Sequence, residues 1–595
     1  MYASMMPKIH SSQSSTKVDT TLYDNKSLDF YIKTRHWLSN PTKSFFKLFG
    51  QFVESENRIQ ISPQTIPGDI YEDKIILIQQ FYINNNVQRH NENKLCLSLN
   101  VKNKYIDKII LLNERIYTEK ELGIQSLKIK QINIGQRLTY KGVFDYLSSA
   151  NIKGYIILAN TDIFFDQTLN HVKVSGLHKE RKVYCQLRHE YNNEQILNSC
   201  KLYYNRPDNQ DTWIWHTNSI VTQKQGEIFN YQMGKNGCDN KTIYVFGILG
   251  FACHNEPIFI KTYHYHISQI RNYLSKGKVP GPYYSIHPYI SHMPPANKLH
   301  TFDIVRENDS LREYISLKLK SGNPFIIPRI AGVENETALS GVFIKNNNVN
   351  KRLLTLIKKQ IYGMKKNAGI MLNDMQSISK YSSLYLAAFE KCERYFWCEP
   401  WGNVVKYIPQ SFDFILENFP KPKIDTLALD VFHSINREPW TLALRGKRIL
   451  IISPFKESFE EKIAIREKIY GIDLFPDCEF VFIKPPQTQA DNPSRPFDVE
   501  LNIFLSKLES IKDTFDIALC SCGGYGNLVC SGLYNMGKSA IYVGGVLQMY
   551  FGIYGERWMR DRPDIMKLYY NKYWSRPKLT ERPKGFQTIE GGCYW

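Results

Sequence analysis

The sequence predicts an α/β protein made of two Rossmann-like domains. Short apolar runs alternate with helical segments, the later apolar runs end in Gly or Pro, and a proline-containing segment, 292–300, separates two such series. With 595 residues, the chain is long enough for about two to four domains. We expect a disordered tail over 1–25, an extension over 26–70, and domains over 71–295 and 305–595.

The first domain is predicted from strands and helices that alternate after residue 73. They follow in the order strand 74–83, helix 89–103, strands 106–115 and 128–135, helix 139–151 and strand 154–165. Strands spaced by helices favour a parallel sheet covered by helices, and ligands bind such sheets beyond the carboxyl ends of the strands. The polar residues that follow the apolar run 155–159 lie at such an end.

The second domain repeats the pattern. Residues 323–339 read as a strand that runs into a helix, and apolar strands follow at 446–455, 478–486, 515–526 and 537–545. Glycines between a strand and a helix, Gly523, Gly524 and Gly526, let backbone N–H groups approach a phosphate. The pattern around them is not the dinucleotide fingerprint, because no acidic residue ends the next strand.

Composition narrows the function classes. Hydrophobic residues make up 43% of the chain, which indicates a globular protein, and the net charge of +19 suits either an anionic ligand or a lysine-rich surface. The positive charge is spread along the chain without the basic block of a nucleic-acid arm. Twelve cysteines without paired CxxC motifs indicate free thiols, and no signal peptide or transmembrane segment is expected. We therefore expect a cytoplasmic protein.

The stretch "NTDIFFD" contains the first candidate metal ligand. Asp162 follows an apolar strand on a short turn, where a carboxylate can hold a hard divalent cation, Mn²⁺ or Mg²⁺, against a diphosphate. If the diphosphate belongs to a nucleotide-sugar, Asn160 would bond its ribose or its sugar. Asp166 is expected to cap the next helix. The alternative is an ordinary strand and turn, since Asn and Asp are common turn residues.

Residues 71–288 resemble glycosyltransferases of the GT-A fold, in particular GT-A-like domains of large DNA viruses and some bacteria. The resemblance rests on the ordered pieces "QFYI…R…E…CL", "IILLNERIYT", "RLTYKGVFDYL", "GYIILANTDIFFD", "DTWIW", "GKNGCDN" and "YHYHISQIRNY". It departs from the family at Asn160, where many such enzymes have the first Asp of a DxD motif. The resemblance implies donor-binding roles for Phe81, Tyr82, Arg137, Tyr140, Asn160, Asp162 and Asp211.

Three further positions take roles from this resemblance. Asp239 would be the general base that accepts the proton of the acceptor hydroxyl, or alternatively a helix N-cap. His264 would be an additional metal ligand, and on a strand it shares a face with His266, two residues on. A buried histidine bonded to backbone is the alternative. Arg271 would meet a phosphate or an acidic acceptor, and the alternative for Arg137 is a surface salt bridge.

The second domain resembles the GT-D type of glycosyltransferase domain found in bacterial polysaccharide and glycoprotein pathways. The stretch "IPRIAGVENETAL" is similar to the segment that opens such domains, although Val333 replaces an acidic residue of the family signature. The resemblance implies a second donor site made of Arg329, Glu334, Gly523, Gly524, Tyr525, Gly526 and Gly545. His433, Arg437 and Trp440 could line the same cleft or be ordinary packing and surface residues.

Together these features predict a metal-dependent glycosyltransferase of the hexosyl or deoxyhexosyl transferase class. It would move a sugar from a nucleotide-sugar donor to a glycan or glycoprotein acceptor, with inversion if Asp239 is the base. The second domain could be a second transferase or an acceptor-binding module. A viral protein would act in the host cytoplasm or in the virion. The alternatives are a non-catalytic carbohydrate-binding scaffold and, on charge alone, a nucleic-acid-binding protein, although no nucleic-acid module is recognisable.

Overall fold

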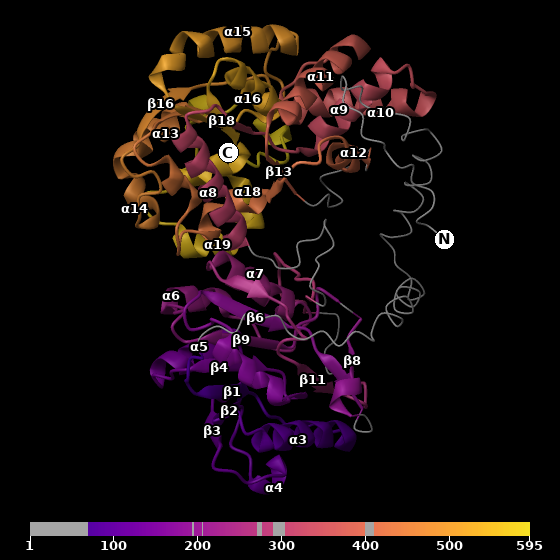
Figure 1. The fold of residues 1–595 in the computed structure, drawn as a ribbon, viewed down its shortest axis with the longest axis vertical. Coiled ribbons are helices and arrows are strands. Elements are labelled where there is room, and N and C mark those ends of the chain that lie inside the picture. The colour runs from indigo at the N-terminus through magenta and orange to yellow at the C-terminus, as the bar shows by residue number, and fades with distance from the viewer. Residues whose placement is uncertain are drawn as a thin grey trace.

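The computed structural model describes residues 70–192, 196–204, 206–270, 277–289, 304–398, 408 and 410–595, with side chains from residue 307 in the fifth range. Two α/β units are stacked along the long axis, the first drawn in indigo to magenta and the second in rose through orange to yellow (Figure 1). The predicted tail, nearly all of the extension, the segment 292–300 and Arg271 lie outside the described residues.

A seven-stranded sheet forms the centre of the first unit. Its order is β10-β6-β9-β4-β1-β2-β3, and β9 alone runs antiparallel to its neighbours. The strands are β1 (Ile75–Gln79), β2 (Lys108–Asn113), β3 (Ile129–Asn133), β4 (Tyr155–Ala159), β6 (Lys182–Gln186), β9 (Thr212–His216) and β10 (Ala252–His254). The predicted α/β class is confirmed, and the sheet is mixed. Because β9 is reversed, its first residue lies at the same edge as the last residue of β4.

Helices cover both faces of this sheet. Alternate residues of β1 point to opposite faces, so that Leu77 packs in one core cluster with Leu97 of α3, and Ile78 packs in another with Val143 of α5. The helices of this unit are α3 (Val87–Lys102), α4 (Glu119–Leu122), α5 (Tyr140–Ser149), α6 (Gln223–Gly226) and α7 (Cys238–Ile248). A small second sheet, in the order β5-β11-β7-β8, lies beside the carboxyl end of β4; it comprises β5 (Ile163–Phe165), β7 (His189–Tyr191), β8 (Lys201–Leu202) and β11 (Thr262–Tyr265).

The second unit contains a five-stranded parallel sheet in the order β12-β18-β17-β15-β16. Its strands are β12 (Ile326–Ile327), β15 (Arg448–Ile452), β16 (Glu479–Ile483), β17 (Ile517–Cys520) and β18 (Ser539–Tyr542), as the apolar runs predicted. A separate two-stranded sheet pairs β13 (Tyr395–Trp397) with β14 (Lys423–Asp425). The main helices are α8 (Ile304–Ser321), α9 (Gly332–Lys345), α10 (Lys351–Gly363), α11 (Met375–Lys391), α12 (Gln410–Asn418), α15 (Phe497–Ile511) and α16 (Gly526–Asn535). Shorter helices are α13 (Lys456–Lys462), α14 (Arg466–Tyr470), α17 (Leu547–Tyr550), α18 (Glu556–Asp561) and α19 (Pro563–Tyr569).

Helix α7 joins the two units (Figure 1). One continuous core cluster includes residues of the first sheet, of α7 and of the second sheet. Lys241 of α7 forms an ion pair with Asp564 of α19, and His433 Nδ1 lies 3.0 Å from the carbonyl oxygen of Gly247. His433 is therefore an interface residue, and Trp440, fully buried with its indole N–H donating to Tyr550 at 2.8 Å, is a packing residue.

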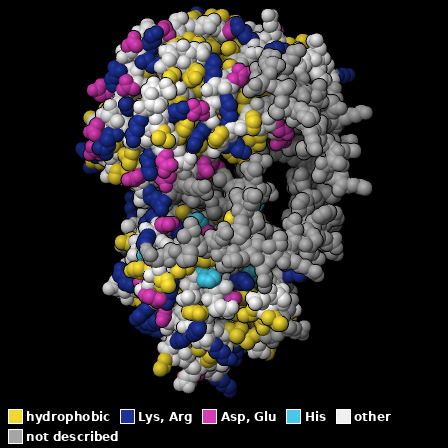
Figure 2. Space-filling view, in the orientation of Figure 1, with side chains coloured by type: hydrophobic (Ala, Val, Ile, Leu, Met, Phe, Trp, Pro, Cys, Tyr) yellow, Lys and Arg dark blue, Asp and Glu magenta, His cyan; other side chains and the backbone are white. Residues whose placement is uncertain are grey.

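The surface matches the charge distribution of the sequence. On the face shown in Figure 2, Lys and Arg side chains are interspersed with acidic and apolar ones over both units and do not gather in one block. Within the described parts of the chain, every helix is too short or too polar to span a bilayer.

Candidate functional site

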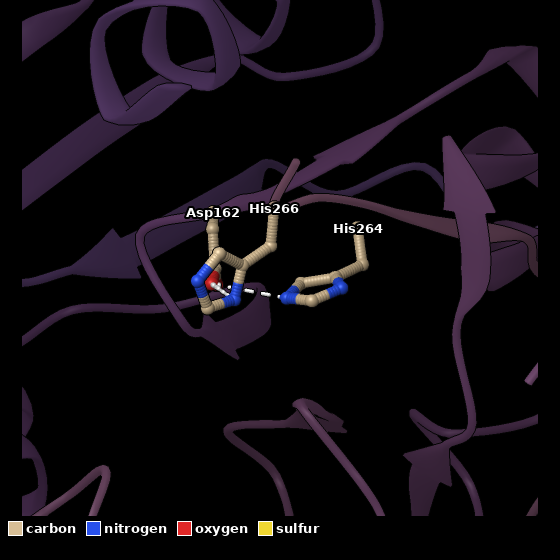
Figure 3. Close-up of side chains that lie close together, drawn as sticks. All are labelled: Asp162, His264 and His266. Carbon is tan, nitrogen blue, oxygen red and sulfur yellow. Dashed lines mark hydrogen bonds and ion pairs between the residues drawn. The ribbon is translucent and has the colours of Figure 1, made fainter. Parts of the chain in front are cut away.

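Asp162, His264 and His266 form a compact cluster at the carboxyl end of β4 (Figure 3). Asp162 lies in the turn between β4 and β5, and β11 pairs with β5 so that the backbone N–H of Tyr265 donates to the carbonyl oxygen of Asp162 at 3.0 Å. One potential ligand atom from each of the three side chains lies within 4.8 Å of the others. The two-residue spacing of the histidines puts both on the side facing Asp162, as the sequence indicated.

The donor set of this cluster fits a divalent cation. Asp162 supplies a carboxylate and the two histidines supply imidazoles, and all three side chains are buried. Imidazole nitrogens suit transition metals better than Mg²⁺, which prefers oxygen ligands. The residues present therefore fit Mn²⁺ better than Mg²⁺.

A chain of charged side chains surrounds the cluster. Asp162 Oδ2 lies 2.5 Å from Arg89 Nη2 and 3.1 Å from His264 Nε2, and the other ring nitrogen of His264 lies 3.1 Å from Glu190 Oε2. Arg89 also pairs with Glu92, while Arg188 pairs with both Glu190 and Asp211. Neighbours in this chain alternate in sign, so each buried charge has an opposite partner.

The pKa values follow from this pairing. Burial disfavours ionisation of Asp162, but His264 and Arg89 outweigh it and keep the pKa of Asp162 well below its usual range. Burial also lowers the pKa of His264, but Asp162 outweighs that effect and the pKa rises to about 9. The pKa of Glu190 falls to about 2 because His264 and Arg188 overcome the effect of its burial.

Two predicted donor-binding residues come together beside β1. The guanidinium of Arg137 lies over the ring of Tyr82, 5.1 Å from its centroid. Gly234, the first residue of "GKNGCDN", lies so close that a Cβ there would be 3.2 Å from Arg137 Nη2. The segment after β1, the arginine and the glycine loop thus meet at one place.

Two other predicted donor-binding residues are buried. Phe81 is 1% exposed and packs edge-on against Tyr117, and Tyr140, also 1% exposed, donates its hydroxyl proton to Cys238 Sγ at 3.6 Å. Both are packing residues of the core. Their contact with a donor stays a prediction.

Asn160 and Asp211 lie at the edge where β4 ends and β9 begins, and Asp239 lies in α7. Asn160 Nδ2 donates to Asp211 Oδ1 at 2.7 Å, which joins the end of β4 to the start of β9. Asp239 lies in the first turn of α7, and the N-cap is Gly237, so the alternative that Asp239 is the cap is wrong. Burial raises the pKa of Asp239 to about 7, and the negative charge of Asp211 adds to the effect. A carboxylate with this pKa suits proton transfer near neutral pH.

Asp166 has the structural role that was expected. It is the N-cap of the 3-10 helix η1 (Gln167–Val174), where its carboxylate accepts from the backbone N–H of Thr168 at 2.9 Å. The hydroxyl of Tyr263 donates to its other oxygen at 2.9 Å.

Sequence reasoning missed the charged partners of the cluster. Arg89 and Glu92 lie within the piece "QFYI…R…E…CL" without a predicted role, and nothing in the sequence around Arg188 or Glu190 marks those residues. The one available signal was the three-residue spacing of Arg89 and Glu92, which places both on one face of a helix.

The second unit has its candidate site at the carboxyl ends of β12 and β18. Arg329 Nη1 donates to the carbonyl oxygen of Val543 at 3.3 Å, and a Cβ on Gly544 would lie only 2.3 Å from the same nitrogen. Burial raises the pKa of Glu334, while the nearby charge of Arg329 opposes the shift. Gly545 packs against the ring of Tyr594, which would lie 2.4 Å from a Cβ at that position.

The glycine-rich turn of the second unit is closely packed. Cβ atoms on Gly523, Gly524 and Gly526 would approach Ala368, Ile370 and Tyr542 to 2.8, 2.5 and 2.3 Å, and Tyr525 is 1% exposed. Close packing explains these glycines. Phosphate binding there stays a prediction.

No protein-family model and no curated protein matches the chain. Among solved structures, the mannosyltransferase PcManGT from Pyrobaculum calidifontis in complex with GDP-Man and Mn²⁺ aligns over 42% of this chain and 70% of its own, with 9% identity and a TM-score of 0.27. A glycosyltransferase (DUF1792) from Streptococcus sanguinis aligns over 40% of this chain and 81% of its own, with 13% identity and a TM-score of 0.25.

Proposed function

We propose that the chain is a glycosyltransferase that uses a nucleotide-sugar donor and a divalent cation in its first unit. The observation that supports this most is the buried cluster of Asp162, His264 and His266. Arg137 lies over Tyr82 after β1, and Asp239 lies close enough to Asp211 for the two charges to interact. A metal, an anion-binding arginine and a carboxylate of raised pKa are the parts that transfer from a nucleoside diphosphate requires.

The cluster and the residues near it take separate roles in the reaction. A cation at Asp162, His264 and His266 would supply positive charge to the leaving diphosphate. Tyr82 would contact the nucleobase, and Arg137 would contact a phosphate. Asn160 and Asp211, already bonded to each other, would contact the ribose or the sugar.

Asp239 would act on the acceptor, a glycan or glycoprotein hydroxyl. The hydroxyl oxygen attacks the anomeric carbon while the bond from that carbon to the diphosphate oxygen breaks, and the hydroxyl proton passes to the Asp239 carboxylate. A single displacement of this kind inverts the anomeric configuration. The near-neutral pKa of Asp239 allows it to accept the proton at neutral pH.

The second unit would hold a second donor site around Arg329 and Glu334. The close approach of Arg329 to Gly544 supports this, because the guanidinium is positioned at the carboxyl ends of two parallel strands. The protein would then be bifunctional.

Donor turnover by the full chain tests the proposal. UDP-, GDP- and dTDP-sugars are incubated with the protein and Mn²⁺, and release of the nucleoside diphosphate is measured. Turnover of at least one donor is expected, and His264→Gln should lower it about a hundredfold or more. His171→Gln is the matched control, because His171 bonds the carbonyl of Phe259 outside the cluster. Sugar binding without turnover would instead identify a carbohydrate-binding scaffold.

A further inference from the structure

Arg89 forms an ion pair with the carboxylate of Asp162, the central residue of the cluster of Asp162, His264 and His266. Its Nη2 lies 2.5 Å from Asp162 Oδ2, its Nη1 lies 3.0 Å from Glu92 Oε2, and its side chain is 8% exposed. The residue is in the first turn of α3, where its backbone N–H donates to the N-cap Asn86 at 2.9 Å. Both the backbone and the guanidinium of Arg89 are thus fixed by hydrogen bonds.

The ion pair uses the atom that a cation would need. The nitrogen atoms of His264 and His266 lie 3.1 and 4.0 Å from Asp162 Oδ2, the same oxygen that Arg89 contacts. A divalent cation bonded to this oxygen would lie next to the guanidinium, and two like charges at such a distance in a buried site repel strongly. The cation and Arg89 therefore compete for the Asp162 carboxylate.

The surroundings of Arg89 restrict where the guanidinium can move. Glu92 is itself held by the backbone N–H of Ser268 at 2.6 Å and by the Ser268 hydroxyl at 3.0 Å, so it anchors one side of the guanidinium. His90, the next residue on α3, packs edge-on against Phe81 with 5.8 Å between ring centroids. Phe81 precedes Tyr82, which contacts Arg137, so the start of α3 lies next to the residues assigned to the donor.

We propose that Arg89 is a displaceable internal cation that pairs with Asp162 when no metal is bound and binds the donor diphosphate once a metal has taken its place. This inference rests on the proposed function of the cluster. The metal alone must break a buried ion pair and leave a guanidinium without its partner, which is unfavourable. A nucleoside diphosphate gives that guanidinium a new anionic partner, so metal and diphosphate bind with positive coupling.

Mn²⁺ binding to the full chain tests this inference without any turnover. Free Mn²⁺ is measured by electron paramagnetic resonance during titrations without nucleotide, with UDP and with GDP. For the unaltered protein, one of the two nucleotides should tighten Mn²⁺ binding about tenfold or more. Arg89→Met should bind Mn²⁺ about tenfold more tightly than the unaltered protein without nucleotide, and most of the coupling should disappear.

Three further variants complete the experiment. Arg89→Gln removes the charge but keeps hydrogen-bond donors, and its Mn²⁺ affinity should match that of Arg89→Met. If the Met variant fails to fold, the Gln variant supplies the Mn²⁺ affinity without the arginine charge. Arg115→Met is the control and should change nothing, because Arg115 pairs with Glu121 on the surface. Asp162→Asn should abolish binding.

The outcomes separate the inference from the proposed function. If Asp162→Asn abolishes Mn²⁺ binding but neither Arg89 variant tightens it, the role of Arg89 is overturned and the metal site stands. If the unaltered protein binds no Mn²⁺ that depends on Asp162, with or without nucleotide, both are overturned.

Discussion

Asn160 Nδ2 donates a hydrogen bond to Asp211 Oδ1 over 2.7 Å, across the sheet edge where β4 ends and β9 begins. The bond links the turn that presents Asp162 to the residue whose charge contributes to the raised pKa of Asp239. An amide is suited to this position because a carboxylate there would face the carboxylate of Asp211.

Asn160→Asp is therefore expected to destabilise the protein at neutral pH, by about 1–3 kcal/mol, although it creates the sequence Asp-x-Asp. Repulsion would raise one carboxyl pKa in the folded state above its unfolded value. Stability should then be retained at acidic pH and lost as the pH rises through that raised pKa. Thermal melting between pH 4 and 8 measures this. Asn209→Asp is the control, because Asn209 accepts from Arg188 at 2.6 Å; an equal loss there would contradict the account.

The raised pKa of Asp239 predicts how kcat falls at acidic pH, the acid limb of its pH profile. A general base acts in its ionised form, and the pKa of Asp239 is about 7, so kcat should rise as the pH increases through about 7. Asp239→Asn should lower kcat about a hundredfold or more with little change in KM. Asp208→Asn, which removes a nearby charge that raises the pKa of Asp239, should keep kcat and move the limb to lower pH. An unchanged limb in Asp239→Asn would refute the assignment.

The ion pair between Lys241 and Asp564 predicts that the two units are coupled in stability. Both side chains are mostly buried, at 6% and 16% exposure, so Asp564→Asn leaves a buried ammonium without its counter-charge. A loss of about 3 kcal/mol in unfolding free energy is expected from denaturant melting. Lys567→Met, on the same helix, removes only an exposed bond to the carbonyl of Glu227 and should cost far less. Similar losses for the two variants would show that the pair is not important.

Gly544 tests the second candidate site. It has a φ of +78°, and a Cβ would lie 2.3 Å from Arg329 Nη1, so Gly544→Ala adds displacement of Arg329 to backbone strain. Gly537→Ala is matched in strain, with a φ of +74°, but nothing lies within 4 Å of its Cβ. Both should lower the melting temperature, Gly544→Ala by several degrees more. Equal shifts would indicate that Arg329 is not fixed at this position.

Local patterns predicted much of the fold and part of the site. Apolar runs located the main strands, and the turn after β4 and the two-residue histidine spacing located the cluster. The burial of Tyr140 can also be predicted from the sequence, since Tyr140, Val143, Phe144 and Leu147 share one face of α5. The contacts of Arg89 and Glu190 with the cluster could not be predicted from the sequence. They arise because α3 and β7 pack near Asp162 and His264, although these segments are far apart in the chain.

The most direct test of the metal site compares two aspartates that lie four residues apart. Mn²⁺ binding to the full chain, in the presence of UDP or GDP, is measured for Asp162→Asn and Asp166→Asn. Asp162→Asn should lose binding by about a hundredfold or more because it removes the central ligand. Asp166→Asn keeps a side-chain oxygen that can cap η1, because Asn is as good an N-cap as Asp, and it should keep Mn²⁺ affinity within about twofold. Equal Mn²⁺ affinities for the two variants, or a loss confined to Asp166→Asn, would contradict the proposed site.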